Sequence, residues 1–329
     1  MAISSITRHQ AGDAGAIYTT GRQCMWFKSL LIYRFTKPFE LSADQIHEKL
    51  SEREFKPCSS QEMSTLGWVR PLGQQGSELV HETNGCFMVC SQRQDKVLPA
   101  AVVNEALEEK LYELREQEDR KPGRKERLDM KEELVFEMLP RAFARSRKQY
   151  AYIDPANGWL IVDGATHKRA EELIVLLREC LGSMPVIPIT AKNTAYHTMT
   201  PWLKSAAPEN FELGGECELI DGADESAVIR CKNQDLASKE ILSHIDCGML
   251  VSKLALTWSG GLDFMVDDQL TVKRLRFSDL IMERAGDINS ESAADQFDVD
   301  FSIMSAELAK FIPSLLNAFG GEDTSDVES

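Results

Sequence analysis

Segment 141–148, RAFARSRK, holds the side chains best suited to binding an anion. It carries four basic residues and one phenylalanine, and it has no acidic residue. If a helical twist continued through the segment, Arg141, Arg145 and Lys148 would share one face, which suits several phosphates along a duplex. A solvated helix end is an equally good interpretation, because the helix dipole also attracts basic residues there.

Signatures of common catalytic sites are missing from the sequence. It contains no GxxxxGK[ST] phosphate loop, no GxGxxG, no GxSxG and no HExxH. The six histidines are scattered and predict neither a metal cluster nor a triad. Asp154 and Asp163 with Lys168 form only a loose version of the site that a magnesium-dependent nuclease needs. Both aspartates lie at predicted strand ends, where an aspartate needs no catalytic explanation.

The cysteines and the apolar runs bound the cellular setting. Eight cysteines occur without a CxxC pair, which favours core thiols in a reducing compartment over a disulfide framework. Cys86 and Cys90 are predicted to share a strand face, but with His81 alone nearby they make a poor zinc site. No run approaches the roughly 18 apolar residues of a membrane span. We therefore expect a cytoplasmic protein with no metal and no cofactor.

The charge is unevenly distributed along the chain. The formal net charge is −15, which at face value argues against a nucleic-acid partner. Residues 283–329, however, contain eleven acids and two bases, a net charge of −9. Residues 120–148 contain ten bases and five acids, a net charge of +5. The middle of the chain is therefore locally basic, and much of the acidity is C-terminal.

Two β-hairpins and a helical pair are predicted in the first two thirds of the chain. Asn84-Gly85 and Asn157-Gly158 each separate two apolar runs, and both dipeptides accept the positive φ that hairpin turns require. Between the hairpins, 104–120 and 124–139 carry apolar residues at helical spacing on either side of Pro122-Gly123. The pattern indicates two antiparallel helices that project like a finger, with Pro140 ending the second.

Interleaved strands and helices without regular βαβ spacing predict an α+β fold with mixed, mostly antiparallel sheets and a projecting helical hairpin. The C-terminal part contains strand-like VIRCK, a helix over 236–245, a hairpin across Asp267-Asp268 and a last helix near 304–319. The predicted units are a disordered upstream extension (1–24), an N-terminal α+β part of a central domain (25–98), a helical finger (99–148), a second ββαβ part (149–215) and a C-terminal α+β part with an acidic tail (216–329).

Several motifs occur in the order typical of one family. They are MWFKSLLIYRF from Met25, GW at Gly67, LPRAF at Leu139, NG at Asn157, KNQDL at Lys232 and GGE at Gly320. In these motifs the chain resembles the RdgC family from Met25 to about Glu322. The resemblance implies a homodimer closed head to head and tail to tail into a ring that encircles double-stranded DNA, with single-stranded DNA as a second candidate partner. It also implies binding without sequence preference, association with the nucleoid, antagonism of the RecA recombinase, and no catalytic activity or membrane partner.

The resemblance also implies roles for particular residues. Phe143 corresponds to a finger aromatic tied to ring integrity and DNA binding, and 232–234 to a polar segment near the second dimer contact. Asn233 and Met249 stand where a relative has lysine, which puts individual contacts in doubt. With the basic stretch, the predicted DNA-binding residues are Lys121, Arg124, Lys125, Arg141, Phe143, Arg145, Arg147, Lys148, Arg230, Lys232, Asn233 and Gln234.

A basic ring lining under an acidic exterior would reconcile DNA binding with the net charge, because the field concentrates inside the hole. Two alternatives stay open. The first is a magnesium-dependent nuclease that uses acids such as Asp154 and Asp163. The second is a protein-interaction module that acts on the recombinase through the acidic C-terminal region.

Overall fold

The computed structural model describes residues 26–118, 120–222, 226–288, 290 and 292–325. The predicted upstream extension, residues 1–24, lies outside them. Within the described residues, twelve strands form one sheet in which β2-β4-β5-β6-β1-β12-β11-β10-β8-β9 are successive neighbours, with β3 beside β4 and β7 beside β1. Every strand pair is antiparallel, so the α+β, mostly antiparallel prediction is confirmed.

The strands are β1 Leu30–Phe35, β2 Ser64–Val69, β3 Val80–Thr83, β4 Cys86–Val97, β5 Phe143–Asp154, β6 Trp159–Asp163, β7 Val186–Pro188, β8 Phe211–Asp221, β9 Val228–Lys232, β10 Met249–Trp258, β11 Leu262–Asp267 and β12 Val272–Phe277. The helices are α1 Ala43–Ser51, α2 Ala100–Glu118, α3 Arg124–Met138, α4 His167–Leu181, α5 Ala195–Lys204, α6 Lys239–Asp246, α7 Asp279–Asp287 and α8 Ala293–Ala318, with 3-10 turns η1 Gly73–Gln75 and η2 Leu139–Arg141. In the part of the chain described, no helix is long and apolar enough to cross a membrane.

Both predicted NG hairpins are confirmed. Thr83 pairs with Cys86 across a two-residue loop, in which Asn84 and Gly85 have φ values of 52° and 75°. Both values lie in the left-handed region that a type I′ turn requires. The β5–β6 hairpin closes through a longer loop that ends at Gly158, where φ is 68°.

The helical interpretation of 141–148 is wrong. Only η2, through Arg141, continues the helical twist after α3; from Phe143 onward the chain is strand β5. Strand β5 pairs with β4 from Phe143 opposite Val97 to Ile153 opposite Phe87, a range that includes all of its exposed residues. Side chains on a strand alternate between faces. Arg145 and Lys148 therefore point to opposite faces of the sheet.

Other element boundaries also differ from the predictions. The last helix, α8, begins at Ala293 rather than near Met304, because Ser292 and Asp295 form a capping box. It runs for 26 residues through Pro313. The helix expected over 236–245 begins at Lys239. Strand β8 and helix α5 were not predicted.

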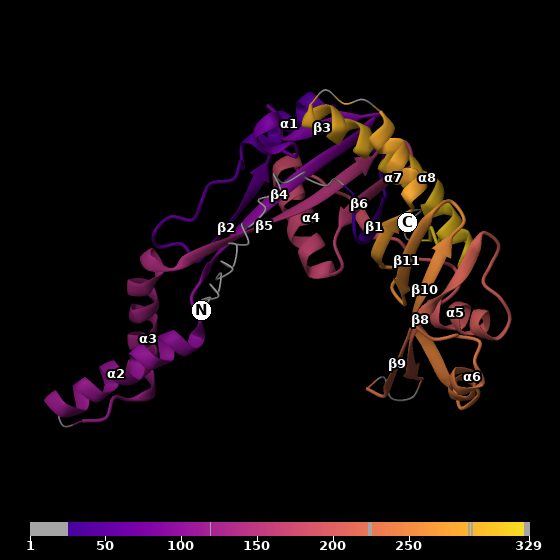
Figure 1. The fold of residues 1–329 in the computed structure, drawn as a ribbon. Helices are drawn as coiled ribbons and strands as arrows, with labels where there is room; N and C mark the ends of the chain where they lie inside the picture. Colours follow the sequence, from indigo (N-terminus) through magenta and orange to yellow (C-terminus); the bar gives the residue numbers. More distant parts are fainter. Residues whose placement is uncertain (1–25, 119, 223–225, 289, 291, 326–329) are drawn as a thin grey trace, which may run out of the picture.

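The elements form an arch, which Figure 1 shows from the side. Helices α2 and α3 make one end of the arch, and β9 with α6 makes the other. Helix α4 lies under the arch, whereas α8 follows its outer side. Helices α2 and α3 pack against each other through a small cluster of their own, which comprises Leu107, Leu111, Met130 and Leu134.

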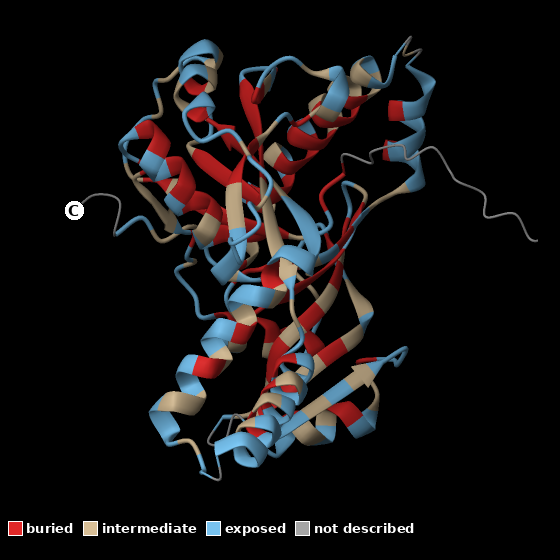
Figure 2. Ribbon diagram, turned by 90° about the vertical axis from the view of Figure 1, so that its left-hand side faces the viewer, coloured by how far each residue is buried: buried red, intermediate tan, exposed pale blue. Residues whose placement is uncertain are grey.

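Two cores hold the sheet in place, one on each face of its N-terminal half. Helices α1 and α4 cover one face, where Ile46 and Leu177 pack with Leu31 of β1. Helix α8 covers the other face, where Met304 packs with Ile32, and this core continues beneath α5 and α6 into the C-terminal half. Figure 2 shows the buried residues concentrated along the strands and on the inward faces of these helices.

The segment after α8 is tied back to β1. Glu322 accepts a bidentate pair of hydrogen bonds from Arg34, with 2.7 Å between Nε and Oε1. The same guanidinium lies over the ring of Trp159, 5.4 Å from its centroid, and donates to the carbonyl oxygen of Asn157. Both charged side chains are less than one-fifth exposed. The GGE motif thus has a structural role, because it closes the C-terminus onto the centre of the sheet.

We predict that Glu322→Gln lowers the free energy of unfolding by about 1–3 kcal/mol, because it leaves a partly buried guanidinium without its carboxylate. Urea denaturation followed by tryptophan fluorescence measures this change. The control is Glu132→Gln on the exposed surface of α3, which should stay within about 0.5 kcal/mol of the parent. Equal unfolding midpoints for the two variants would contradict a stabilising role for the pair.

Candidate nucleic-acid interface

The predicted DNA-binding residues lie at two ends of the arch. All twelve are exposed, and Phe143 is 87% exposed. Eight of them, from Lys121 to Lys148, lie just before α3, on α3, on η2 and on the distal half of β5. The other four lie on β9 or just after it; they are Arg230, Lys232, Asn233 and Gln234. Figure 1 places these two groups at opposite ends, so a single chain does not bring them together.

Arg145 and Arg147 lie on the face of the sheet that α4 covers farther along β5. They have the same parity as Ala151 and Ile153, which pack in the core beneath α1 and α4. The distal parts of β4 and β5 extend beyond that core, so all residues of β5 from Phe143 to Lys148 are exposed. The two arginines therefore face the inner side of the arch, where α4 lies.

One carboxylate organises the arginines on this face. Asp95 of β4 accepts hydrogen bonds from Arg93 at 2.7 Å and from Arg147 at 2.6 Å. Burial alone would raise the pKa of Asp95, but the hydrogen bonds from the two arginines outweigh it and lower the pKa. Asp95 therefore stays ionised and holds two guanidinium groups side by side, and Glu172 of α4 lies 3.6 Å from the Arg93 guanidinium.

A small cleft between α4 and the β4–β5 ribbon collects further cations. Its charged lining residues are Arg93, Arg147, Lys148, Arg169 and Glu172, of which Lys148 turns its side chain toward the opposite face of the ribbon by strand alternation. Arg169 comes from the first turn of α4, whose N-cap, Thr166, makes no side-chain capping bond. The helix dipole adds positive potential at such an end. The cleft is therefore a basic recess on the inner side of the arch, suited to phosphate oxygens.

Sequence reasoning missed Arg93 and Arg169. Arg93 is directly opposite Arg147 in the β4–β5 register, although the two residues are more than fifty positions apart. Arg169 reaches the same place because α4 packs back over the sheet. The alternation of charge and amide in SQRQDK, 91–96, is the one local signal that indicated a two-faced polar strand.

The α2–α3 end of the arch is more balanced in charge. Arg120 pairs with Glu118 and Glu126, and Arg127 pairs with Glu108. These ion pairs are exposed and contribute little to stability. Lys121, Arg124 and Lys125 make no ion pair with any residue that the structure describes. Three cations thus remain available at this end.

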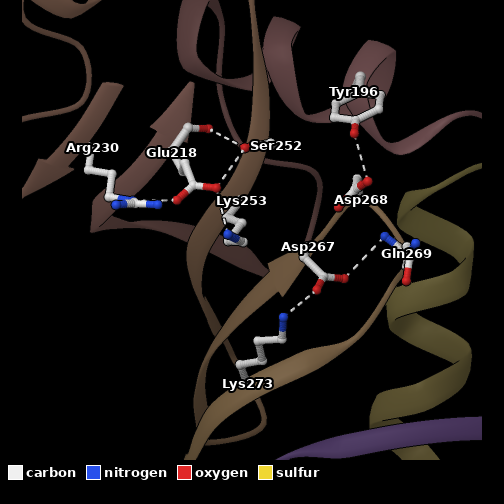
Figure 3. A network of polar contacts seen from close by, with 9 residues as sticks. All are labelled: Tyr196, Glu218, Arg230, Ser252, Lys253, Asp267, Asp268, Gln269 and Lys273. Atoms are coloured by element: carbon white, nitrogen blue, oxygen red, sulfur yellow. Dashed lines mark hydrogen bonds and ion pairs between the residues drawn. The ribbon is translucent and has the colours of Figure 1, made fainter. Parts of the chain in front are cut away.

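The four residues at the other end lie on or beside the sheet face that α5, α6 and α8 leave open. Arg230 donates to Glu218 at 2.8 Å, and Lys253 donates to the same carboxylate at 2.5 Å (Figure 3). Burial opposes ionisation of Glu218, but these two cations lower its pKa nonetheless. One positive charge therefore remains uncompensated, since two cations share one carboxylate.

The exposed segment 232–234 turns away from β9. Asn233 has a φ of 51°, in the left-handed region that asparagine tolerates, and the Gln234 N–H donates to the Gly215 carbonyl at 3.1 Å. Elsewhere in the C-terminal half, Lys273 pairs with Asp267 at 2.6 Å, and Tyr196 donates to Asp268 (Figure 3). The side chains of 232–234 are thus exposed while their backbone is held.

The carboxylates considered for a nuclease are not brought together. Asp154 and Asp163 lie at opposite ends of the β6 hairpin strand, since Asp154 pairs with Trp159 and Asp163 with Leu30. Asp154 accepts from the backbone and side chain of Asn157 at 3.0 and 2.7 Å. Asp163 accepts from two backbone N–H groups, and its burial outweighs them and raises its pKa. Both side chains thus have structural roles.

Metal-ligating residues do not cluster elsewhere in the described chain. Across the ranges that the structure describes, no group of three or more His, Cys, Asp or Glu side chains is placed to hold a metal ion. His81, which was considered beside Cys86 and Cys90, lies 3.1 Å from Asp298 of α8 and packs edge-on against Phe297. It therefore contributes to the contact between β3 and α8.

Comparison with known proteins gives the family. A family model described as "Putative exonuclease, RdgC" matches residues 25–322. "Recombination-associated protein RdgC" of Tolumonas auensis is 44% identical over 299 residues, which cover 91% of this chain and 99% of that protein. Proteins of the same name from Aeromonas hydrophila and Pseudomonas aeruginosa are each 43% identical, covering 92% and 91% of this chain and 100% and 98% of their own. The chain belongs to the RdgC family of recombination-associated proteins.

Proposed function

We propose that this chain binds double-stranded DNA without reading its sequence and holds the duplex on the inner side of the arch. The observation that carries the proposal is the basic recess formed by Arg93, Arg147 and Arg169 between α4 and the β4–β5 ribbon. Arginine and lysine side chains and helix N-termini bind phosphate oxygens, which are the same at every base pair. Contacts of this kind give affinity and orientation without sequence preference.

The distribution of charge supports the same side of the molecule. Arg145 and Arg147 of β5 and Arg169 of α4 face inward, whereas α8, which carries Asp295 and Asp298, follows the outer side. A duplex approaching the inner side meets positive potential, and one approaching the outer side meets acids. The net charge of −15 is thus compatible with DNA binding in one orientation.

We further propose that two copies close into a ring by joining like ends. At one end, large apolar side chains on α2, α3 and β5 are more than half exposed, among them Tyr112, Phe136 and Phe143. At the other end, β9 is the terminal strand of the sheet that the described residues form, and its outer edge pairs with no other described strand. Exposed aromatic side chains and a free strand edge are both typical of surfaces that a second copy covers.

The proposed biological effect follows from occupancy. A recombinase assembles on DNA or exchanges DNA strands, so a protein that encloses the same duplex restrains RecA without touching it. Association with the nucleoid would follow from sequence-independent affinity. The alternatives are a nuclease and a protein that contacts the recombinase directly, and cleavage and strand-exchange assays distinguish them.

We predict that the affinity for a labelled duplex falls with salt in a log–log plot, with a slope of about −0.9 for each phosphate neutralised. The double variant Arg145→Gln/Arg169→Gln should make the slope shallower by about 0.9 for each phosphate that is no longer neutralised, and it should weaken binding equally for unrelated sequences. Fluorescence anisotropy at several salt concentrations measures both.

The matched control for this titration is Lys239→Gln on α6, which covers the sheet face away from the inner side. Its slope and affinity should equal those of the parent. A parent affinity that does not depend on salt, or equal losses in the control and the double variant, would overturn phosphate binding at the inner face formed by the recess and the adjacent Arg145.

We predict that Phe143→Ala shifts the chain from dimer toward monomer, with the dimer dissociation constant rising at least about tenfold. An 87%-exposed aromatic ring adds nothing to the packing of one chain, so the free energy of unfolding of the monomer should not change. Analytical ultracentrifugation measures the first quantity and urea denaturation the second. An unchanged dimer constant would contradict a dimer interface at this end.

We predict that millimolar Mg²⁺ neither raises the unfolding temperature of the chain nor causes loss of plasmid, because Asp154 and Asp163 are separated and each is bonded to its own turn or backbone. Calorimetry and gel electrophoresis with and without EDTA test this. Magnesium-dependent cleavage that Asp163→Asn abolishes, with folding retained, would establish the nuclease instead.

We predict that inhibition of RecA strand exchange declines in parallel with DNA affinity across the parent, the Arg145→Gln/Arg169→Gln variant and the Lys239→Gln control. A parallel decline is expected because occupancy of DNA is the proposed cause. Inhibition that persists in the double variant after its DNA affinity has gone would favour direct contact with the recombinase through the acidic C-terminal region.

A further inference from the structure

Cys217 and Cys231 form a directly opposed cysteine pair at the edge of the sheet. Cys217 of β8 pairs in register with Cys231 of β9, and the register between these strands is unbroken from Glu216 opposite Lys232 to Ile220 opposite Val228. Directly opposed residues place their side chains on the same face. The Cys231 thiol contributes to the raised pKa of the Cys217 thiol, so the two groups interact. The two thiols are therefore neighbours on one face of the sheet.

The backbone geometry at this pair is compatible with a disulfide. The Asp221 N–H donates to the Ala227 carbonyl, so by alternation along the ladder Cys217 and Cys231 occupy a hydrogen-bonded position. Opposed Cα atoms at such a position are about 5.5 Å apart. Disulfides span Cα separations of about 4.4–6.8 Å. The two strands need not separate or slide for the sulfurs to bond.

The two thiols differ in exposure. Cys217 is 3% exposed and packs in the core beneath α6, whereas Cys231 is only partly buried. Burial raises the pKa of the Cys217 thiol to about 12, and the neighbouring Cys231 contributes. Cys231 is therefore the thiol that solutes reach first, and Cys217 is held against it from the core side.

The other described cysteines lack this arrangement. Cys86 is opposite Thr83, and Cys90 is opposite Val69 and Tyr150. Cys180 lies on α4 and accepts a hydrogen bond from Trp68, and Cys247 is exposed at the end of α6. Among the described residues, only Cys217 and Cys231 are in directly opposed strand positions.

We propose that Cys217 and Cys231 are a redox-modification site at which a hydroperoxide forms a cross-strand disulfide. The Cys231 thiol releases its proton, and the thiolate attacks the peroxide, so that an S–O bond forms and the O–O bond breaks. The departing hydroxide or alkoxide takes up that proton and leaves as water or an alcohol. The Cys217 sulfur then attacks the Cys231 sulfenic acid, the S–O bond breaks, and the departing hydroxide takes the Cys217 proton as water. The two cysteines lose two electrons and two protons, and the peroxide is reduced. The opposed positions of the two cysteines offset the weak acidity of Cys217.

The disulfide would link the terminal strand of the sheet covalently to its neighbour. Strand β9 is terminal, and β8 is its only neighbour in the sheet that the described residues form. Without a covalent link such an edge opens locally with little loss of packing. The disulfide joins β9 covalently to β8 and closes a loop of about 14 residues, which restricts that opening. Oxidation therefore stiffens the end of the arch that carries Lys232 and Gln234.

The test uses the reduced full-length chain treated with hydrogen peroxide, blocked with N-ethylmaleimide in denaturant and digested for mass spectrometry. The expected product is a crosslinked pair of peptides containing residues 217 and 231, two hydrogens lighter than the reduced pair and absent after reduction. Amide exchange in β9 of the oxidised chain should slow by at least about tenfold. Cys231→Ser should give no crosslink, and Cys217→Ser should stop at a sulfenic acid on Cys231 that dimedone traps.

The control is Cys247→Ser, which removes an exposed thiol and should leave the crosslink unchanged. Because the main result is read in the parent chain, a variant that fails to fold does not affect it. Recovery of both cysteines as maleimide adducts, or oxidation of Cys231 beyond sulfenic acid without a crosslink, would overturn the proposal. Neither result would bear on DNA binding, which is measured on the reduced chain.

Discussion

The pairing of strand β1 is the constraint on which the arch depends. One edge of β1 pairs with β6 over five residues, and its other edge is divided between β7 and β12. The contact with β12 is a single pair, Leu30 opposite Val272, so few ladder hydrogen bonds connect the two halves of the sheet. The burial of α8 across that junction compensates, because its apolar side chains pack on both halves. Burial of apolar surface contributes about 25 cal/mol per Å², so the buried side chains of α8 help to hold the two halves together.

Polar side chains near this junction make hydrogen bonds that hold neighbouring segments to β1. Arg34 of β1 donates a hydrogen bond to Glu322, which follows α8. Asp163, at the end of β6, accepts one from the Lys28 N–H just before β1. The carboxylates of Glu322 and Asp163 therefore already accept hydrogen bonds within the fold. The cations available to a ligand are those beyond the core, on the distal ribbon of β4 and β5 and at the start of α4. Polar groups around β1 are thus bonded within the fold, whereas the basic side chains of distal β4 and β5 and of the start of α4 lie at its periphery.

Local signals in the sequence were sufficient for the hairpins and insufficient for the binding face. Asn84-Gly85 favours its turn through the positive φ that both residues accept, so the sequence predicted the hairpin, and the structure adds its register, with Thr83 opposite Cys86. Segment 143–148 has no apolar alternation, because both faces of the ribbon are exposed there, and its pattern wrongly favours a helix. Its strand conformation comes from pairing with β4, some fifty residues earlier. The same non-local pairing brings Arg93 to Arg147, which no short window of sequence contains.

The different chemistry of the two ends bears on whether the proposed assembly closes. An α2–α3 end with exposed aromatic side chains and a β9 end with a free strand edge are each more complementary to their own kind than to one another. Contacts between like ends are isologous and require a two-fold axis at each. A chain with two such contacts forms a closed pair only if both axes coincide, and otherwise extends into a fibre. The arch has both ends on the same side, as Figure 1 shows, which allows one axis to serve both. The curvature that places cations on the inner side is therefore also what would let two copies close around a duplex.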